Sequence, residues 1–511
     1  MDDLLLIVNL GLKSIRSIVF DWRGEKLAFS SRLLETSLKD DRVEQDPEEW
    51  WGKAQETIRE VLSKRNLAKR VRYITVTASS SCLVAVGDDL KALCPAIMVS
   101  DRRAEAQAQA LSKAAAFAEV KEITGLESNP SLMLPKIMWL KDEEPDVFSK
   151  TRFYLSPNDY VIAQFTGEVI TDHFDAQKFH YDANSKTYPS ALFAEIGIRD
   201  DQIPPSVSPG QDAGCVLPGV AADLGLRADT RVIVSTYDAI CAFFGSGVSD
   251  LGEACDVSGT VSSLRVLTPK NINDPSGRTL ITPFADDGVY IVGGSNNMGG
   301  GLIEWAKQAL YSRDEFPYQA MEEEARGVGV GADGLTFLPY LMGERAPVWD
   351  VDARGVFFGI ERYHGRADMA CAVFESTAFA IRHLMEAIED AGAEIKRIRV
   401  SGGLTRIALV QSLKADITGR EIAVVDEFET TALGAAMLVG RGIGIYTDIH
   451  DAAKMSRIRL TIHPDPERHA IYEDHYQLYR ETYQTLKPLF KKRAAILAKQ
   501  GQGVETTMAN L

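Results

Sequence analysis

The feature that most constrains the fold is a strand–turn–strand pattern that occurs twice, at the start of the chain and again near its middle. The first copy has an apolar run over residues 4–9, a turn at Gly11 and a second run over residues 15–21. The second copy has runs over residues 253–258 and 262–267, joined by a turn of small residues. The repeat predicts two domains built on the same plan, although the two copies share little sequence identity.

Strand and helix patterns alternate between the two copies, up to about residue 247, as in an α/β protein. One helix is predicted to begin at Asp46, with Pro47 in its first turn and apolar residues at helical spacing behind it. Later helices are expected at about 369–390 and 407–418. Because 511 residues exceed what one hydrophobic core usually serves, we expect an N-terminal domain at 1–247, a C-terminal domain at 248–490 and a polar tail at 491–511.

Composition narrows the classes of partner. The formal net charge is −16 and no face rich in Lys and Arg is apparent, which argues against nucleic acid as the main partner. No apolar run is long enough to span a membrane and the first residues are acidic, so a cytoplasmic protein without a membrane partner is expected. The six cysteines and eight histidines form no ligand-spaced cluster, which argues against a structural transition metal. Assembly as a homodimer stays open.

The chemistry-bearing segment follows the apolar run at residues 232–234. Asp238 stands at the end of this predicted strand, where a carboxylate can accept a proton from an alcohol. About twenty residues later, Ser258-Gly259-Thr260 forms a turn whose backbone N–H groups and hydroxyls can approach a phosphate. A base and a phosphate-binding turn together indicate phosphoryl transfer to a hydroxyl. The alternative for Asp238 is a helix N-cap, and the two roles are compatible.

Several further motifs, in this order and spacing, resemble the FGGY carbohydrate kinases, and the resemblance runs from about residue 5 to 485. The motifs are Gly11–Arg16 with Phe20-Asp21, Glu44–Trp50, Ser100–Arg103, Asp159-Tyr160, Thr166–Glu168, Thr171-Asp172, Tyr237-Asp238, Ser258–Thr260, Phe337–Tyr340, Gly343–Pro347, Ser401–Gly403 and Thr430–Ala436. The resemblance implies two actin-like, ribonuclease-H-like domains with an interdomain cleft, and ATP-dependent phosphorylation of a sugar or polyol. By overall resemblance to xylulokinases, xylulose or a related pentulose is the expected substrate.

On the sugar side, the resemblance implies that the segment Ser79-Ser80-Ser81 and the residues Asp101, Arg103 and Asp238 bind substrate. Xylulokinases and glycerol kinases carry larger polar side chains where this chain has serines. Serine hydroxyls can bond to sugar hydroxyls, but a plain small-residue turn explains them as well. Asp101 and Arg103 either contact the substrate or form a salt bridge that shapes the pocket.

On the nucleotide side, the resemblance implies that ATP and Mg²⁺ are bound by residues of both domains. The expected nucleotide-binding residues are Gly11, Lys13, Ser14, Arg16, Gly259, Thr260, Gly300, Gly402, Gly403 and Arg406, and the expected metal-binding residues are Asn9 and Asp238. Lys13 is either directed at the γ-phosphate or an exposed hairpin lysine, and Arg16 is either the family's arginine or a surface strand residue. The segment Thr430–Ala436 resembles part of the adenosine-binding region.

Three positions depart from the family pattern. Asn9 stands where the family usually has an Asp that helps to hold magnesium, Leu12 replaces a Thr of the phosphate turn, and Ile407 stands where a Ser is frequent. Asn keeps the shape of Asp but loses the negative charge that suits a hard cation. The chain is thus expected to be a sugar kinase, with a weakened sugar- or nucleotide-binding homologue of regulatory role as the alternative. An actin-like ATPase without a sugar acceptor is disfavoured because the resemblance includes the sugar-side segments.

Overall fold

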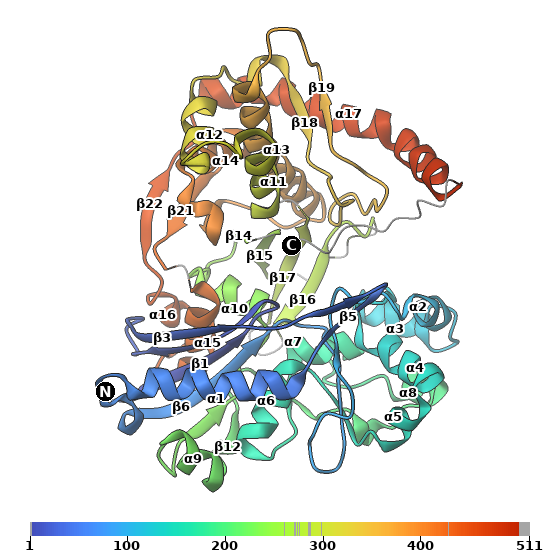
Figure 1. The fold of residues 1–511 in the computed structure, drawn as a ribbon, viewed down its shortest axis with the longest axis vertical. Helices are drawn as coiled ribbons and strands as arrows, with labels where there is room; N and C mark the ends of the chain where they lie inside the picture. Colours follow the sequence, from blue (N-terminus) through green and yellow to red (C-terminus); the bar gives the residue numbers. More distant parts are fainter. Residues whose placement is uncertain are drawn as a thin grey trace. The chain divides into compact units, whose positions relative to one another are not determined.

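The computed structural model describes residues 3–499, except residues 260, 270, 271, 273, 275, 285–287, 298 and 428 and the side chains of residues 65 and 66. The chain forms two compact units (Figure 1). Unit 1 comprises residues 1–247, 283–288 and 429–456, and unit 2 comprises residues 248–282, 289–428 and 457–511. Residues 429–456, which we expected in the C-terminal domain, return to unit 1 because the helix they contain packs against another helix there.

Unit 1 is built on a six-stranded sheet of order β12–β13–β6–β1–β2–β3. Its strands are β1 (Leu4–Leu10), β2 (Ser14–Phe20), β3 (Lys26–Leu33), β6 (Val71–Ala78), β12 (Asp212–Cys215) and β13 (Arg231–Ile233). β1 pairs antiparallel with β2 and parallel with β6. The strand–turn–strand expected at the start of the chain is therefore confirmed, and its first strand lies inside the sheet.

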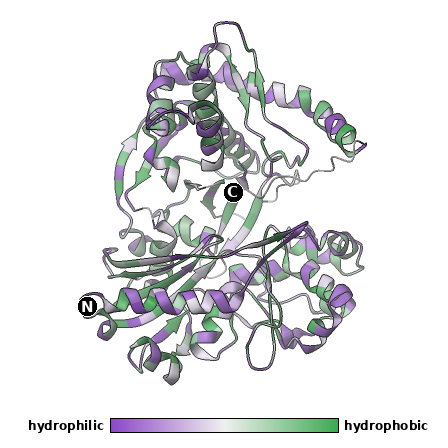
Figure 2. Cartoon of the chain, viewed as in Figure 1, coloured by the Kyte–Doolittle hydropathy of each residue, from purple (hydrophilic) through white to green (hydrophobic). Residues whose placement is uncertain are grey.

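Helices α1 (Pro47–Ser63) and α6 (Pro157–Thr166) share one hydrophobic core on one face of this sheet. Helix α1 contacts β2 and β3, and α6 contacts β6. The side chain of Asp46 caps α1, as expected, by accepting a hydrogen bond from the Glu48 N–H, and α1 alternates hydrophilic and hydrophobic residues along its length (Figure 2). Leu6 and Val8 of β1 share a hydrophobic core with α1. Because side chains alternate along a strand, Asn9 points to the opposite face.

Two further helices of unit 1, α10 (Asp238–Gly245) and α15 (Thr430–Gly442), approach each other very closely. A Cβ atom on Gly434 would lie 1.7 Å from the carbonyl oxygen of Cys241, and one on Gly245 would lie 1.8 Å from that of Thr430. The residues resembling an adenosine-binding segment, 430–436, are thus buried helix-packing positions, apart from the half-buried Thr431. Within this segment, Thr430 and Gly434 make the closest approach to α10.

The remaining elements of unit 1 lie mainly between β3 and β13 in the sequence. They are β4 (Ser37–Lys39), β5 (Arg42–Gln45), β7 (Val84–Val86), β8 (Ala96–Ile97), β9 (Phe153–Leu155), β10 (Thr171–Asp172), β11 (Ser206–Val207), α2 (Glu105–Leu111), α3 (Phe117–Thr124), α4 (Met133–Glu143), α5 (Pro145–Lys150), α7 (His173–Ala176), α8 (Ser190–Ile196), α9 (Pro218–Leu224) and α16 (Ile449–Ala453). Helices α2, α3, α4 and α8 share a second hydrophobic core, which includes Leu111, Phe117, Trp139 and Phe193.

Unit 2 has a seven-stranded sheet of order β16–β17–β15–β14–β20–β21–β22. Its strands are β14 (Glu253–Ser258), β15 (Ser262–Thr268), β16 (Leu280–Phe284), β17 (Val289–Asn296), β20 (Arg397–Ser401), β21 (Glu421–Val425) and β22 (Ile458–Ile462). Its helices are α11 (Gly300–Tyr311), α12 (Pro317–Arg326), α13 (Arg366–Asp390), α14 (Ala408–Thr418) and α17 (Pro466–Lys499), and β18 (Thr336–Leu338) pairs with β19 (Val356–Phe358) apart from the sheet.

The two sheets repeat one another. In unit 1, the sequence β3–β2–β1–β6–β13–β12 is joined by antiparallel, antiparallel, parallel, parallel and antiparallel pairings. In unit 2, β17–β15–β14–β20–β21–β22 follows the same series of pairings. The repeat predicted from the two strand–turn–strand copies is therefore a repeat of the whole sheet topology.

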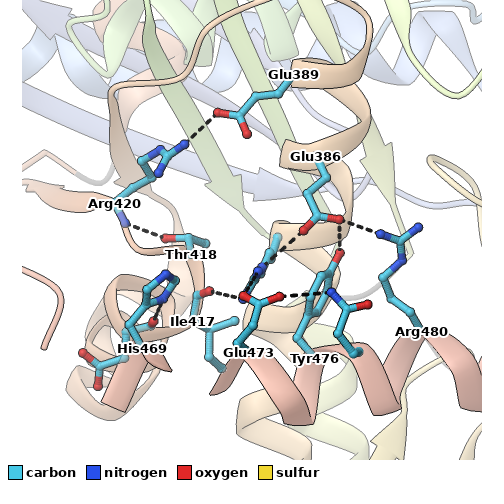
Figure 3. Close-up of polar contacts among 12 residues, drawn as sticks. Glu386, Glu389, Ile417, Thr418, Arg420, His469, Glu473, Tyr476 and Arg480 are labelled. Carbon is cyan, nitrogen blue, oxygen red and sulfur yellow. Dashed lines mark hydrogen bonds and ion pairs between the residues drawn. The ribbon is translucent and has the colours of Figure 1, made fainter. Parts of the chain in front are cut away.

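Polar contacts join α17 to α13, and α13 to the end of α14 (Figure 3). The Arg382 guanidinium of α13 pairs with Glu473 and donates to the carbonyl of Ile417. Glu386 accepts hydrogen bonds from the Tyr476 hydroxyl and the Arg480 guanidinium, each at 2.8 Å.

Because α17 extends to Lys499, residues 491–499 are helical rather than part of a polar tail, and residues 500–511 lie outside the described part of the chain. Within the described part, no helix is both long and apolar enough to span a membrane.

Candidate active site

In unit 1, the ends of two neighbouring parallel strands bring several predicted residues to one edge of the sheet. Asn9 of β1 lies opposite Thr77 of β6, and the Ser79 N–H donates to the Leu10 carbonyl at 3.2 Å. Asn9 is 2% exposed. The turn after β1 and the serine segment after β6 are therefore adjacent, as parallel strands require of segments that follow their carboxyl ends.

Asp238 joins this edge as the first residue of α10. Its Oδ2 atom accepts a hydrogen bond from the Ser79 hydroxyl at 3.0 Å. The N-cap position of α10 belongs to Tyr237, whose side chain makes no capping hydrogen bond. Asp238 therefore benefits from the helix dipole without being the N-cap, which leaves its carboxylate directed to Ser79. Two residues 159 positions apart in the sequence, each predicted to face substrate, are in direct contact.

Three buried carboxyl groups lie near this pair. Burial raises the pKa of Asp175 to about 6, the neighbouring Lys178 ammonium opposes the shift, and the charge of Asp238 adds to it. Burial and the charge of Asp175 raise the pKa of Asp159 and of Asp172 well above the ordinary value. The sequence marked Asp159 and Asp172 as family landmarks, and Asp172 also as a structural or pocket-rim residue. It gave no sign of Asp175, because the proximity of the three arises from tertiary contacts.

A buried lysine, Lys136, donates hydrogen bonds to backbone carbonyls of the serine segment and of a neighbouring segment. Ser81 has a left-handed backbone, with φ at 61°, and its carbonyl accepts a hydrogen bond from Lys136 of α4. Lys136 is completely buried and also donates to the Met98 carbonyl at 2.9 Å. Thus one side chain ties the serine segment to the segment that leads to Asp101. Sequence reasoning missed Lys136, which looks like any other lysine of an amphipathic helix.

We predict a pH dependence of stability that originates at Lys136. Burial lowers the pKa of this ammonium from 10.5 to about 8. Between these values the unfolded chain holds a proton that the folded chain has lost, so this group's contribution to the free energy of unfolding rises with pH. In chemical denaturation from pH 7 to 10, the stability of the parent minus that of Lys136→Met should rise above pH 8. A difference independent of pH would contradict the shifted pKa.

Asp101 and Arg103 form an ion pair. Two nitrogens of the Arg103 guanidinium contact the two Asp101 carboxylate oxygens at 2.9 and 2.7 Å, and Glu44 accepts from the same guanidinium at 2.7 Å. The Val43 N–H also donates to Asp101. The side chains of Arg103 and Asp101 are almost fully buried. Of the two alternatives, the structure contains the salt bridge, while direct contact with substrate remains a prediction.

The turn after β1 joins it to β2 as a tight hairpin. The Gly11 N–H donates to the Ser14 carbonyl at 3.0 Å, and Lys13 in the turn is exposed. Arg16 of β2 forms an ion pair with Glu429, which immediately precedes α15, at 3.0 Å. Arg16 is therefore engaged within unit 1, and nucleotide contacts of Gly11, Lys13, Ser14 and Arg16 remain predictions.

In unit 2, three glycine segments that were predicted separately converge. The Gly300 N–H at the start of α11 donates to the Gly259 carbonyl at 2.7 Å. A Cβ atom on Gly402 would lie 2.5 Å from the Ser258 carbonyl oxygen, so only glycine permits this approach at its φ of 90°. Gly259, Gly300 and Gly402 thus form one surface after β14 and β20. Gly403 and Arg406 follow and are exposed, and Thr260 lies outside the described residues.

The donor set for a metal is sparse. In the described part of the chain, no group of three or more His, Cys, Asp or Glu side chains could hold a metal ion. Asp238 supplies a carboxylate and Asn9 an amide at the same sheet edge. This set fits Mg²⁺, which keeps several water ligands and is usually bound by one or two carboxylates together with substrate phosphates.

Comparison with known proteins agrees with this arrangement. Residues 4–245 match the model of the N-terminal domain of the FGGY family of carbohydrate kinases, and residues 256–443 match that of its C-terminal domain. A xylulose kinase of Bacillus subtilis is 27% identical over 487 residues, covering 94% of this chain and 97% of the relative. A gluconokinase of the same organism is 26% identical over 515 residues, covering 98% and 97%.

Among solved structures, a gluconate kinase from Lactobacillus acidophilus superposes with a TM-score of 0.89 at 26% identity, covering 96% of this chain and 99% of that one. A xylulose kinase from Rhodospirillum rubrum gives 0.88 at 26% identity, covering 96% and 100%. The expectation of two actin-like, ribonuclease-H-like domains is confirmed.

Proposed function

Because this chain belongs to the FGGY family of carbohydrate kinases, we propose that it transfers the γ-phosphoryl group of ATP to a hydroxyl of a ketose or polyol. Xylulose or a related pentulose is the first candidate substrate. The observation that carries the proposal is the hydrogen bond from Ser79 to Asp238, 3.0 Å long, at the carboxyl end of β6. It holds a carboxylate in a fixed orientation beside a wall of small hydroxyl side chains.

In this proposal, Asp238 orients the sugar hydroxyl and accepts its proton late in the transfer, since phosphoryl transfer has a loose transition state and needs no preformed alkoxide. Ser79 keeps the carboxylate in place, and Ser80 and Ser81 offer further hydrogen bonds to sugar hydroxyls. The Gly11 and Gly259 turns offer backbone N–H groups to phosphate oxygens. The nucleoside is assigned to the surface that Gly300, Gly402, Gly403 and Arg406 provide.

Asn9 and Asp238 are the residues that would hold Mg²⁺, and the ion would supply positive charge against the phosphate oxygens. We predict that Asn9→Asp lowers the Mg²⁺ concentration needed for half-maximal activity by several-fold, because it restores a negative ligand. The measurement is a magnesium titration at fixed ATP and sugar. An unchanged titration would mean that the site compensates for the amide.

A second candidate substrate is gluconate, because two relatives and one structural neighbour are named gluconokinase or gluconate kinase. Its carboxylate would need a cation in the sugar site. Lys178 is the candidate, since its ammonium lies 4.8 Å from the ring centre of Tyr237, the residue before Asp238. Lys178→Met would then impair gluconate phosphorylation more than xylulose phosphorylation.

The test is ADP release with Mg-ATP across xylulose, ribulose, gluconate, glycerol and other polyols, followed by identification of the phosphorylated product. A single sugar that strongly stimulates ADP release would be identified as the substrate. Sugar-independent ADP release would favour an ATPase. Silence across the panel despite ATP binding by calorimetry would favour the weakened binding homologue, and Asn9, Leu12 and Ile407 would be its cause.

A further inference from the structure

A buried ion pair lies directly behind the Gly259 turn of unit 2. The Lys414 ammonium of α14 contacts the Asp256 carboxylate of β14, and the two side chains are 1% and 0% exposed. Lys414 also donates to the Ser258 hydroxyl at 3.0 Å, and that hydroxyl donates to the other Asp256 oxygen at 2.8 Å. The three side chains form a closed network, and Ser258 is the first residue of the turn.

This network connects the two parts of the surface assigned to the nucleotide. Asp256 lies in a strand that pairs with both β15 and β20. Lys414 lies in α14, the helix that begins just after Gly402, Gly403 and Arg406. The Ser262 hydroxyl approaches that of Ser258 at 3.2 Å and closes the hairpin from the other side. One lysine therefore joins α14 to the turn between β14 and β15.

Lys414 neutralises the charge of Asp256 in addition to packing against it. The carboxylate lies one hydrogen bond behind Ser258, and buried charges are screened far less than exposed ones. Without a cation beside it, this carboxylate would oppose the binding of a polyanion at the turn. Lys414 cancels the charge and also fixes the Ser258 hydroxyl.

We propose that Lys414 is a positioning residue for the polyphosphate of the nucleotide: it neutralises Asp256 and holds Ser258, so that the Ser258-Gly259 turn can accept phosphate. This inference rests on the proposed binding of ATP at that turn. It predicts an asymmetry between the two partners. Losing the cation leaves a negative charge behind the phosphate site, whereas losing the carboxylate does not.

The experiment compares Lys414→Met with Asp256→Asn by calorimetric titration of ATP and of adenosine, which has no phosphate. We expect Lys414→Met to weaken ATP binding at least tenfold and to change adenosine binding less than twofold. Asp256→Asn should keep ATP binding within about threefold of the parent. A purely structural pair would instead weaken both ligands alike in both variants, because each variant breaks the same contact, and that result would overturn the proposal.

The double variant Asp256→Asn/Lys414→Met keeps the test decisive if Lys414→Met does not fold, because a buried pair can often be replaced as a whole without loss of stability. It should bind ATP less tightly than Asp256→Asn, which retains the cation, and more tightly than Lys414→Met where that variant folds. Equal ATP affinity of the parent, the double variant and Asp256→Asn would show that Lys414 does not hold Ser258 for phosphate binding and would overturn its assignment as a positioning residue. Failure of the parent itself to bind ATP would refute the proposed function as well.

Discussion

Replacing Asp238 with alanine is expected to lower the turnover of sugar phosphorylation by roughly 10²–10⁴-fold, the usual contribution of a general base. Binding of sugar, and of ATP without Mg²⁺, should be largely kept, because the serine segment and the glycine turns stay in place when the proton acceptor and proposed Mg²⁺ ligand is removed. The measurement is steady-state kinetics on the best sugar of the panel, together with calorimetric binding of both substrates. Activity within a few-fold of the parent would refute the assignment of Asp238 as the base.

Ser79→Ala is the matched control for this prediction. It removes only the hydrogen bond that orients the Asp238 carboxylate, so it should cost far less turnover than Asp238→Ala, about tenfold, which corresponds to ~1.4 kcal/mol. The double variant should be no slower than Asp238→Ala alone, because Ser79 acts through Asp238. Additive losses would mean that Ser79 acts on the substrate independently.

The second large effect is expected from Gly434→Ala, in the contact between α10 and α15. The new Cβ atom would lie 1.7 Å from the Cys241 carbonyl oxygen, a backbone atom that cannot move without moving α10. We expect a loss of about 3 kcal/mol in the free energy of unfolding, as for severe overpacking of a core. We also expect a fall in turnover of about 10²-fold, since Asp238 is the first residue of the displaced helix. Chemical denaturation and kinetics measure the two effects.

Gly52→Ala provides the control, because Gly52 lies in α1 and a Cβ atom there meets nothing within 4 Å. Alanine in an open helical position should stabilise the protein by about 1 kcal/mol and leave turnover unchanged. Parent-like stability and kinetics of Gly434→Ala would show that α10 and α15 can separate without cost, and would contradict the idea that their contact positions Asp238.

The sequence predicted the framework of the fold from local signals. Periodic apolar runs and the capping residue Asp46 located strands and helices close to their observed bounds. The return of α15 to unit 1 was not predicted, because it depends on glycine contacts between segments about 190 residues apart. Helix α17 was missed because its buried stripe consists of tyrosines, namely Tyr472, Tyr476, Tyr479 and Tyr483, which are polar enough to hide the pattern.

The candidate site also contains residues that the sequence could predict and residues that it could not. Asp238, Ser79 and the glycine turns carry motifs that sequence alone can detect, and the structure brings Asp238 to Ser79 and Gly300 to Gly259. Lys136 and Lys414 have no motif. Each matters because burial removes its water and leaves specific oxygens as partners, which no local pattern reveals.

The most direct test of the central claim is to quantify ADP and sugar phosphate together during turnover of the parent protein with Mg-ATP and the responding sugar. We expect one sugar phosphate for each ADP, no appreciable ADP without sugar, and loss of both products in Asp238→Ala. ADP formed without sugar phosphate, or formed equally without sugar, would contradict the assignment of this chain as a sugar kinase that uses Asp238 as its base.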